Sequence, residues 1–203
     1  LKISIGVDLA YSKRSSADWS VAVALGYDDA RDLTYVLDVL RMQAQAPVFA
    51  DALKGWRTRW PGSRMHAYLG GTELGVADFF KGKGVPLSVT TATADKLVRA
   101  QPASDAWNAG RVLLPGREQP DGTVASPEWV DVFASELLDI SGVNDEHDDQ
   151  MDAFAAAFDA RPISRGAVVQ PRGVAPPHER DDRLVPARPG WRPGQGRLPN
   201  RHG

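Results

Sequence analysis

Ile3-Ser4-Ile5-Gly6-Val7-Asp8-Leu9 is an apolar stretch near the start of the chain that contains one carboxylate. Its composition predicts a buried β-strand over residues 3–9. Because side chains alternate across a strand, Asp8 is expected to point away from the face that carries Val7 and Leu9. Burying an unpaired carboxylate is costly, so Asp8 needs either a cation or a hydrogen-bonding partner such as a neighbouring turn.

The rest of the first 160 residues alternates between strand and helix patterns. Short polar segments join the strands expected over 3–9, 19–25 and 33–40, which predicts that they are antiparallel. Apolar spacing and turn residues then predict a helix opening at Pro47, strand 65–69, helix 74–80, strand 86–89, a helix over 93–109 interrupted by Pro102, an extended piece over 111–114, and helices over 127–138 and 147–160. For the helix over 127–138, Ser126 is the expected N-cap, and Trp129, Val132, Phe133 and Leu137 form the expected inner face. The order predicts an α/β domain whose mixed central sheet has three antiparallel strands, then parallel strands, and helices on both faces.

Residues 161–203 differ from the rest in composition. They hold nine arginines against three acidic residues, together with many prolines and glycines, and they have no apolar period. Such a segment cannot bury enough apolar surface to offset the entropy of ordering it. We therefore predict one domain over 1–160 and, over 161–203, an extended and largely disordered tail that can order against a partner.

Two further groups of acidic residues stand where elements end or begin. Glu73 follows Gly70-Gly71 after the fourth strand, and Asp148, Asp149 and Asp152 open the last helix. Carboxylates at a helix start can simply be caps or favour the helix dipole. If strands one and four are neighbours in the sheet, however, these acids and Asp8 converge. Gathered carboxylates repel one another unless a divalent cation lies between them, and hard oxygen ligands suit Mg²⁺ or Mn²⁺.

Several classes of function are excluded by what the sequence lacks. There is no cysteine, which excludes disulfides, thiolate metal sites and a cysteine nucleophile, and which fits a reducing cytoplasm. No apolar run approaches the roughly 18–20 residues that cross a bilayer. There is no Gly-x-x-x-x-Gly-Lys-Ser/Thr motif, so no ATP site is predicted in this chain. A sugar-kinase-like or actin-like nucleotide binder would need a glycine-rich loop after the first strand, and residues 12–16 contain no glycine.

Seven segments carry a resemblance to one nuclease family. They are Gly6-Val7-Asp8-Leu9-Ala10, Asp18-Trp19-Ser20-Val21, Tyr35-Val36-Leu37-Asp38-Val39, Gly71-Thr72-Glu73, Asp95-Lys96-Leu97-Val98-Arg99-Ala100, Trp107-Asn108-Ala109-Gly110-Arg111-Val112 and His147-Asp148-Asp149-Gln150-Met151-Asp152-Ala153. In this order they resemble the RNase H-like nucleases, and closely the nuclease domain of tailed-phage terminase large subunits. The resemblance covers about residues 1–160.

The resemblance implies a role for each acid. Asp8 resembles the ligand that bridges two metal ions, Glu73 the second ligand and Asp149 the third, with Asp148 as its rival. Auxiliary roles fall to Asp152, which supports the site or the fold, to Asp18 as an outer acid, and to His147 as a proton carrier or cap. The implied chemistry is two-metal hydrolysis of a phosphodiester bond with Mg²⁺ or Mn²⁺.

The implied substrate is concatemeric double-stranded viral DNA, cut with little sequence preference during genome packaging in the host cytoplasm. Candidate phosphate contacts are Lys13, Arg14, Lys81, Lys83, Lys96, Arg99 and Arg111; each of them can equally be a solvated surface residue. Implied partners are a packaging ATPase domain preceding this region, the portal and the small terminase subunit. Two alternatives stay open: another RNase H-like nuclease such as a junction resolvase or transposase core, and a non-catalytic DNA- or portal-docking module.

Overall fold

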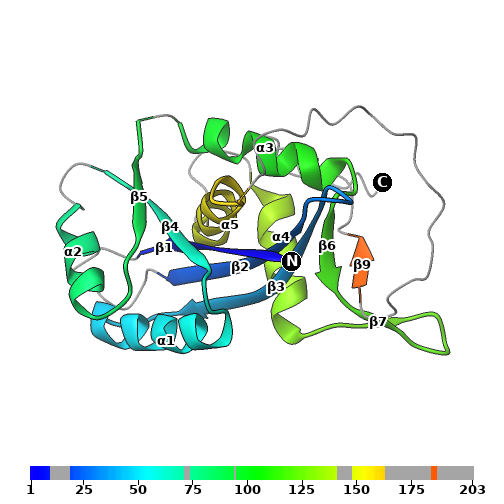
Figure 1. Ribbon diagram of the computed structural model, residues 1–203. Coiled ribbons are helices and arrows are strands. Elements are labelled where there is room, and N and C mark those ends of the chain that lie inside the picture. Colours follow the sequence, from blue (N-terminus) through cyan, green and yellow to red (C-terminus); the bar gives the residue numbers. More distant parts are fainter. Residues whose placement is uncertain (10–18, 71–73, 94, 141–147, 163–183, 187–203) are drawn as a thin grey trace, which may run out of the picture.

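A seven-stranded mixed sheet forms the centre of the computed structural model (Figure 1). The structure describes residues 1–9, 19–70, 74–93, 95–140, 148–162 and 184–186. The strands of the sheet are β1 (Lys2–Asp8), β2 (Ser20–Asp28), β3 (Leu33–Met42), β4 (Arg64–Leu69), β5 (Ser88–Thr91), β6 (Val112–Pro115) and β9 (Leu184–Pro186), and β7 (Arg117–Glu118) pairs separately with β8 (Val124–Ala125). The helices are α1 (Ala46–Arg59), α2 (Leu74–Gly82), α3 (Lys96–Asn108), α4 (Glu128–Asp139) and α5 (Asp149–Asp159).

The pairing within the sheet confirms the predicted mixture of strand directions. The order is β5-β4-β1-β2-β3-β6-β9. The pairs β1–β2 and β2–β3 are antiparallel, whereas β4 pairs in parallel with both β1 and β5, and β6 with β3. Strands one and four are therefore neighbours, which is the condition on which the convergence of the acids depends.

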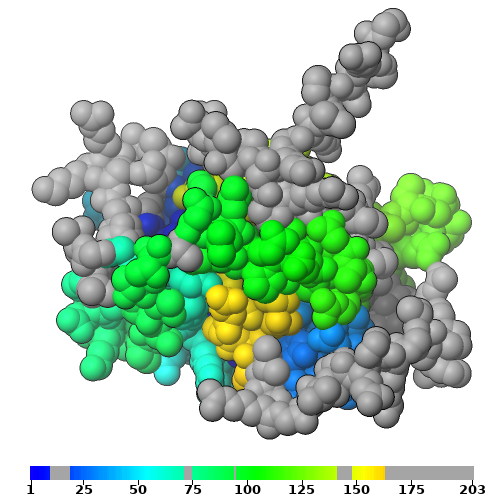
Figure 2. Space-filling model, turned by 90° about the horizontal axis from the view of Figure 1, so that it is seen from above, coloured from blue at the N-terminus to red at the C-terminus, as the bar shows by residue number. Residues whose placement is uncertain are grey.

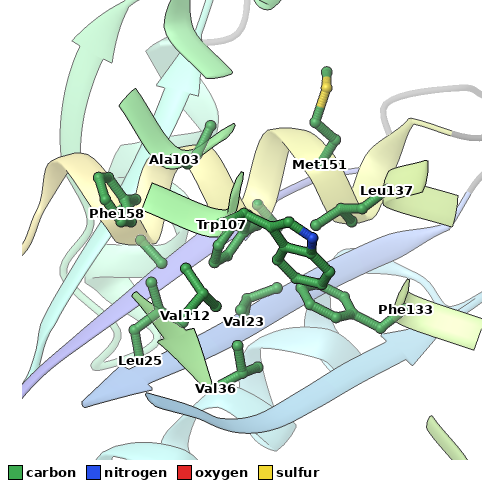
Figure 3. Close-up of a cluster of buried hydrophobic side chains, with 14 of the residues drawn as sticks. Val23, Leu25, Val36, Ala103, Trp107, Val112, Phe133, Leu137, Met151 and Phe158 are labelled. Atoms are coloured by element: carbon green, nitrogen blue, oxygen red, sulfur yellow. The ribbon is translucent and has the colours of Figure 1, made fainter. Parts of the chain in front are cut away.

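Helices cover both faces of the sheet, as predicted. On one face α3, α4 and α5 pack over β2 and β3 around Trp107, which is fully buried (Figure 3). The ring of Phe154 lies edge-on to Trp107, with centroids 6.3 Å apart. On the other face, buried side chains of α1 and α2, including Phe49 and Phe80, pack against Val7 and Leu9. None of the described helices is long and apolar enough to cross a membrane.

Helices α3 and α4 depart from the prediction in detail. Pro102 does not interrupt α3, which runs from Lys96 to Asn108. Its buried residues, Trp107 among them, pack into the core, and this packing compensates for the backbone hydrogen bond that proline cannot make. In α4 the N-cap is Pro127 rather than Ser126.

The inner face of α4 matches the predicted one at Trp129, Phe133 and Leu137 and differs at Val132. Val130 is buried, whereas Val132 is 49% exposed. Val130 is in register with Phe133 and Leu137 at helical spacing, which explains why it replaces Val132 on the inner face.

The segment after Arg161 contributes one short strand. Leu184–Pro186 pairs antiparallel with β6 at the edge of the sheet. The other residues of the predicted tail, 163–183 and 187–203, lie outside the described residues. A short strand at this edge covers hydrogen-bonding groups of β6 that would otherwise be open.

Candidate functional site

Helix α5 lies directly on β1, and small residues of the strand make this possible. The Ser4 hydroxyl donates a hydrogen bond of 2.7 Å to the Ala157 carbonyl. A Cβ at Gly6 would lie 1.9 Å from the Ala153 carbonyl oxygen, so only glycine fits there. The helix backbone therefore rests on the strand backbone at Gly6.

These two contacts set the position of Asp8 relative to the start of α5. Two strand residues advance about 6.6 Å and four helix residues about 6 Å, so Ser4, Gly6 and Asp8 step along α5 four residues at a time. The next step brings Asp8 level with the first turn of α5, which begins at Asp149. Asp8 thus lies on the α5 face of the sheet, opposite the core around Val7, as alternation predicted.

A polar cavity of about 230 Å³ opens at this point. It is lined by Val7, Asp8, Tyr68, Gly70, Ala92, Arg99 and Asp152. The residues come from the ends of β1 and β4, from the segment after β5, and from the starts of α3 and α5. The site therefore draws on segments that are far apart in the sequence and that meet at one end of the sheet.

Arg99 holds Asp152 in the wall of this cavity. The guanidinium Nη2 donates to Asp152 Oδ1 at 3.0 Å, and its Cζ lies 4.6 Å from the centre of the Tyr68 ring. Burial raises the pKa of Asp152, and the nearby Arg99 acts in the opposite direction. Arg99 therefore favours the charged carboxylate in a place that would otherwise disfavour it.

Asp148 occupies the N-cap position of α5, but its carboxylate does not cap the helix. It accepts a hydrogen bond from the Lys96 ammonium instead. Asp95 behaves as an ordinary cap, since it accepts from the Leu97 amide at 2.8 Å. The contact between Lys96 and Asp148 joins the starts of α3 and α5, and Figure 2 shows α3 lying across α5.

Two aromatic side chains of β4 join the strand to α5, and neither was singled out in the sequence. His66 bonds the Ala156 carbonyl through Nδ1 at 3.0 Å, which requires a proton on Nδ1, and its Nε2 lies 2.9 Å from Thr90 Oγ1. Tyr68 donates to the Asp159 carboxylate. Both follow from the pairing of β4 with β1, which a single sequence does not reveal.

Only some of the predicted acids are among the residues that the structure describes. Asp8 and Asp152 line the cavity, and Asp149 is the first residue of the helix that carries Asp152. Five predicted site residues lie outside the described residues: Lys13, Arg14, Asp18, Glu73 and His147. Within the described part of the chain, no three His, Cys, Asp or Glu side chains lie close enough together to hold a metal ion. The carboxylates around the cavity nonetheless present the hard oxygen donors that Mg²⁺ and Mn²⁺ prefer.

The predicted basic residues are divided between the two ends of the sheet. Lys96 and Arg99 are at the cavity, paired with α5 acids. Arg111 precedes β6, and Lys81 and Lys83 precede β5. Because β5 and β6 run in the same direction as β1, these three residues belong to the end of the sheet opposite Asp8. Arg111 is ion-paired there with Asp32 at 2.6 Å.

Comparisons with known proteins agree with this architecture. The family model described as "Terminase RNaseH-like domain" matches residues 5–161. Crystal structures of the large terminase nuclease from thermophilic phage G20c superpose with TM-scores of 0.51 for the form with bound cobalt and 0.50 for the form with bound magnesium. Each is 15% identical and covers 78% of this chain and 80% of its own. No curated protein sequence matches the chain. The predicted RNase H-like fold is confirmed.

Proposed function

The chain belongs to the terminase RNaseH-like domain family, and on that basis we propose that it is a metal-dependent endonuclease that cuts concatemeric viral DNA during genome packaging. The observation that carries the proposal is the cavity at the end of β1, where Asp8 faces the acidic start of α5. Family membership favours this function over a junction resolvase or transposase core.

The proposed metal ligands are Asp8, Glu73 and Asp149, with Asp148 as the alternative to Asp149. Carboxylates from a strand end and a helix start are the donors that Mg²⁺ and Mn²⁺ favour. The G20c large terminase nuclease was crystallised with magnesium and with cobalt. These carboxylates would hold divalent ions, whose chemistry would be to activate a water and to stabilise charge on the leaving 3′ oxygen.

The rest of the site serves to hold these carboxylates in place. Asp8 is the last residue of a strand that is hydrogen-bonded on both sides, to β2 and β4. Asp149 is fixed because α5 rests on Gly6. Arg99 holds the Asp152 carboxylate in the cavity wall. Ligands fixed in this way need little rearrangement when a cation binds.

The proposed substrate is double-stranded DNA, contacted through its phosphates and therefore with little sequence preference. Lys13 and Arg14 follow Asp8 in the sequence and are our main candidates for such contacts. Asp18 and His147 are proposed auxiliaries. We further propose that a packaging ATPase domain, the portal and the small terminase subunit are partners of this domain, and that it acts in the host cytoplasm.

Plasmid cleavage in Mn²⁺ tests the proposal. Asp8→Ala and Asp149→Ala are expected to abolish cleavage while circular dichroism shows an unchanged fold. Asp51→Ala, which removes an exposed carboxylate on α1, is the matched control and should cut like the unaltered protein. Full cleavage by Asp8→Ala, or cleavage that persists in excess chelator, would exclude the metal mechanism, whereas full cleavage by Asp149→Ala alone would transfer the third ligand role to Asp148. An inactive unaltered protein with an intact fold would favour the non-catalytic docking alternative.

A further inference from the structure

Two ion pairs connect the start of α3 with the start of α5. Lys96 pairs with Asp148, and one turn further along Arg99 pairs with Asp152. The two cations are three residues apart on α3, so they lie on one face of that helix. The two anions are four residues apart at the start of α5, so they also share one face. Asp149, the first residue of α5, lies between the two anions in the sequence.

The Arg99–Asp152 pair is built to persist. The side chains of Arg99 and Asp152 are only 15% and 19% exposed. The guanidinium also lies over the ring of Tyr68, at 4.6 Å from its centre. A planar group held by a hydrogen bond and by an aromatic face has little freedom to leave.

The Lys96–Asp148 pair has a different character. The Lys96 side chain is 32% exposed, and an ammonium is a well-hydrated charge on a flexible stem. Asp148 makes no capping bond to the amide groups of its own helix and pairs with this cation instead. Helix capping therefore does not explain the contact, whereas the need to offset the charge of neighbouring carboxylates does.

We propose that Lys96 is the resident counter-ion of the acidic start of α5 and leaves Asp148 when a divalent cation binds there. The inference rests on the proposed metal site, with Asp148 as its ligand from α5, and adds a step to its loading. An ammonium and a divalent cation compete for the same carboxylate and repel each other at short range. Metal-free protein would thus be kept stable by Lys96, and metal-loaded protein by the ion.

Mn²⁺ binding measured by isothermal titration calorimetry tests this exchange in the whole chain. Lys96→Met removes the competitor and is expected to lower the Kd for Mn²⁺ by roughly two- to fivefold, the size expected for a partly exposed charge pair. Lys54→Met, which breaks the exposed Lys54–Asp51 pair on α1, is the matched control and should leave the Kd unchanged. In a protein that already carries Asp148→Asn, adding Lys96→Met should not change the Kd for Mn²⁺ any further.

Thermal unfolding gives a second readout. In EDTA, Lys96→Met is expected to lower the Tm by roughly 2–4 °C, and saturating Mn²⁺ should remove this difference. Should the variant fail to fold, the ammonium resonances of the unaltered protein, assigned with Lys96→Arg, provide the same information. Adding Mg²⁺ should then shift or broaden the Lys96 signal and leave that of Lys54 in place.

The outcomes separate the two proposals. If the unaltered protein binds no Mn²⁺, the metal site itself is wrong. If it binds Mn²⁺ and Lys96→Met binds it equally well or more weakly, the exchange is overturned while the metal site stands. A Tm loss of the same size in EDTA and in Mn²⁺ would overturn the exchange, because it would make the pair purely structural. The exchange would also be overturned if Lys96→Met lowered the Kd for Mn²⁺ by the same factor in the Asp148→Asn protein as in the unaltered one.

Discussion

Gly6 and Ala153 meet backbone to backbone: a Cβ placed on Gly6 would lie 1.9 Å from the Ala153 carbonyl oxygen and 2.3 Å from the Ala157 amide nitrogen. Contacts this short leave no room for any side chain. The glycine therefore sets how closely α5 approaches the sheet. It also determines where the first turn of α5 lies relative to Asp8, two residues further along the strand.

Replacing Gly6 with alanine should accordingly damage both the fold and the site. The added methyl group would force α5 away from β1, and overpacking of this kind costs about 3 kcal/mol or more where backbone must move. Urea unfolding followed by circular dichroism measures the loss. Mn²⁺ affinity should fall as well, because Asp8 and Asp149 no longer lie level.

Gly55→Ala is the matched control for this substitution. Gly55 lies within α1 and has nothing within 4 Å of an added Cβ. Alanine favours a helix interior over glycine, so this variant should gain about 0.5–1 kcal/mol. A Gly6→Ala protein as stable as the unaltered one would show that α5 does not depend on this close approach.

Breaking the Arg99–Asp152 pair should cost more than replacing both partners. Arg99→Met leaves a carboxylate buried without its cation and is expected to cost about 2–3 kcal/mol, below the range for fully buried pairs because both groups keep some exposure. The double variant with Asp152→Leu removes both charges and should recover part of this loss. Urea unfolding of the two single variants and the double variant gives the coupling free energy between Arg99 and Asp152. Strictly additive losses would mean that the pair contributes no interaction of its own.

Patterns that are local in the sequence predicted most of this fold. Apolar alternation located β1, β2 and β3 and gave the orientation of Asp8, and helical spacing located α5. The partners of Lys96 and Arg99 could not be predicted, because each pair joins residues more than 50 positions apart through the packing of α3 on α5. Helical continuity through Pro102 likewise depends on burial that only the folded chain provides.

Arg111 provides a test of which basic residues contact the DNA. It lies before β6, at the end of the sheet opposite Asp8, and pairs there with Asp32 at 2.6 Å. We expect Arg111→Ala to leave DNA affinity and its salt dependence unchanged and to cost less than about 1 kcal/mol of stability. Fluorescence anisotropy with duplex DNA in Ca²⁺ measures the affinity. A salt slope reduced by about one would instead place a phosphate at Arg111.

Tyr68 should make the stability of the protein sensitive to alkaline pH. Burial raises the pKa of the Tyr68 hydroxyl, and its hydrogen bond to the Asp159 carboxylate raises it further. At pH 8 the hydroxyl is neutral in both the folded and the unfolded chain, and Tyr68→Phe should cost about 1 kcal/mol for the lost hydrogen bond. Above pH of about 10 the unfolded tyrosine loses its proton while the folded one keeps it, so the contribution of Tyr68 is lost as pH rises. The difference in unfolding free energy between Tyr68→Phe and the unaltered protein should therefore shrink above that pH in urea titrations. A difference that stays constant from about pH 8 to 11 would mean that the folded and unfolded hydroxyls titrate alike, and that the contact with Asp159 is not maintained in solution.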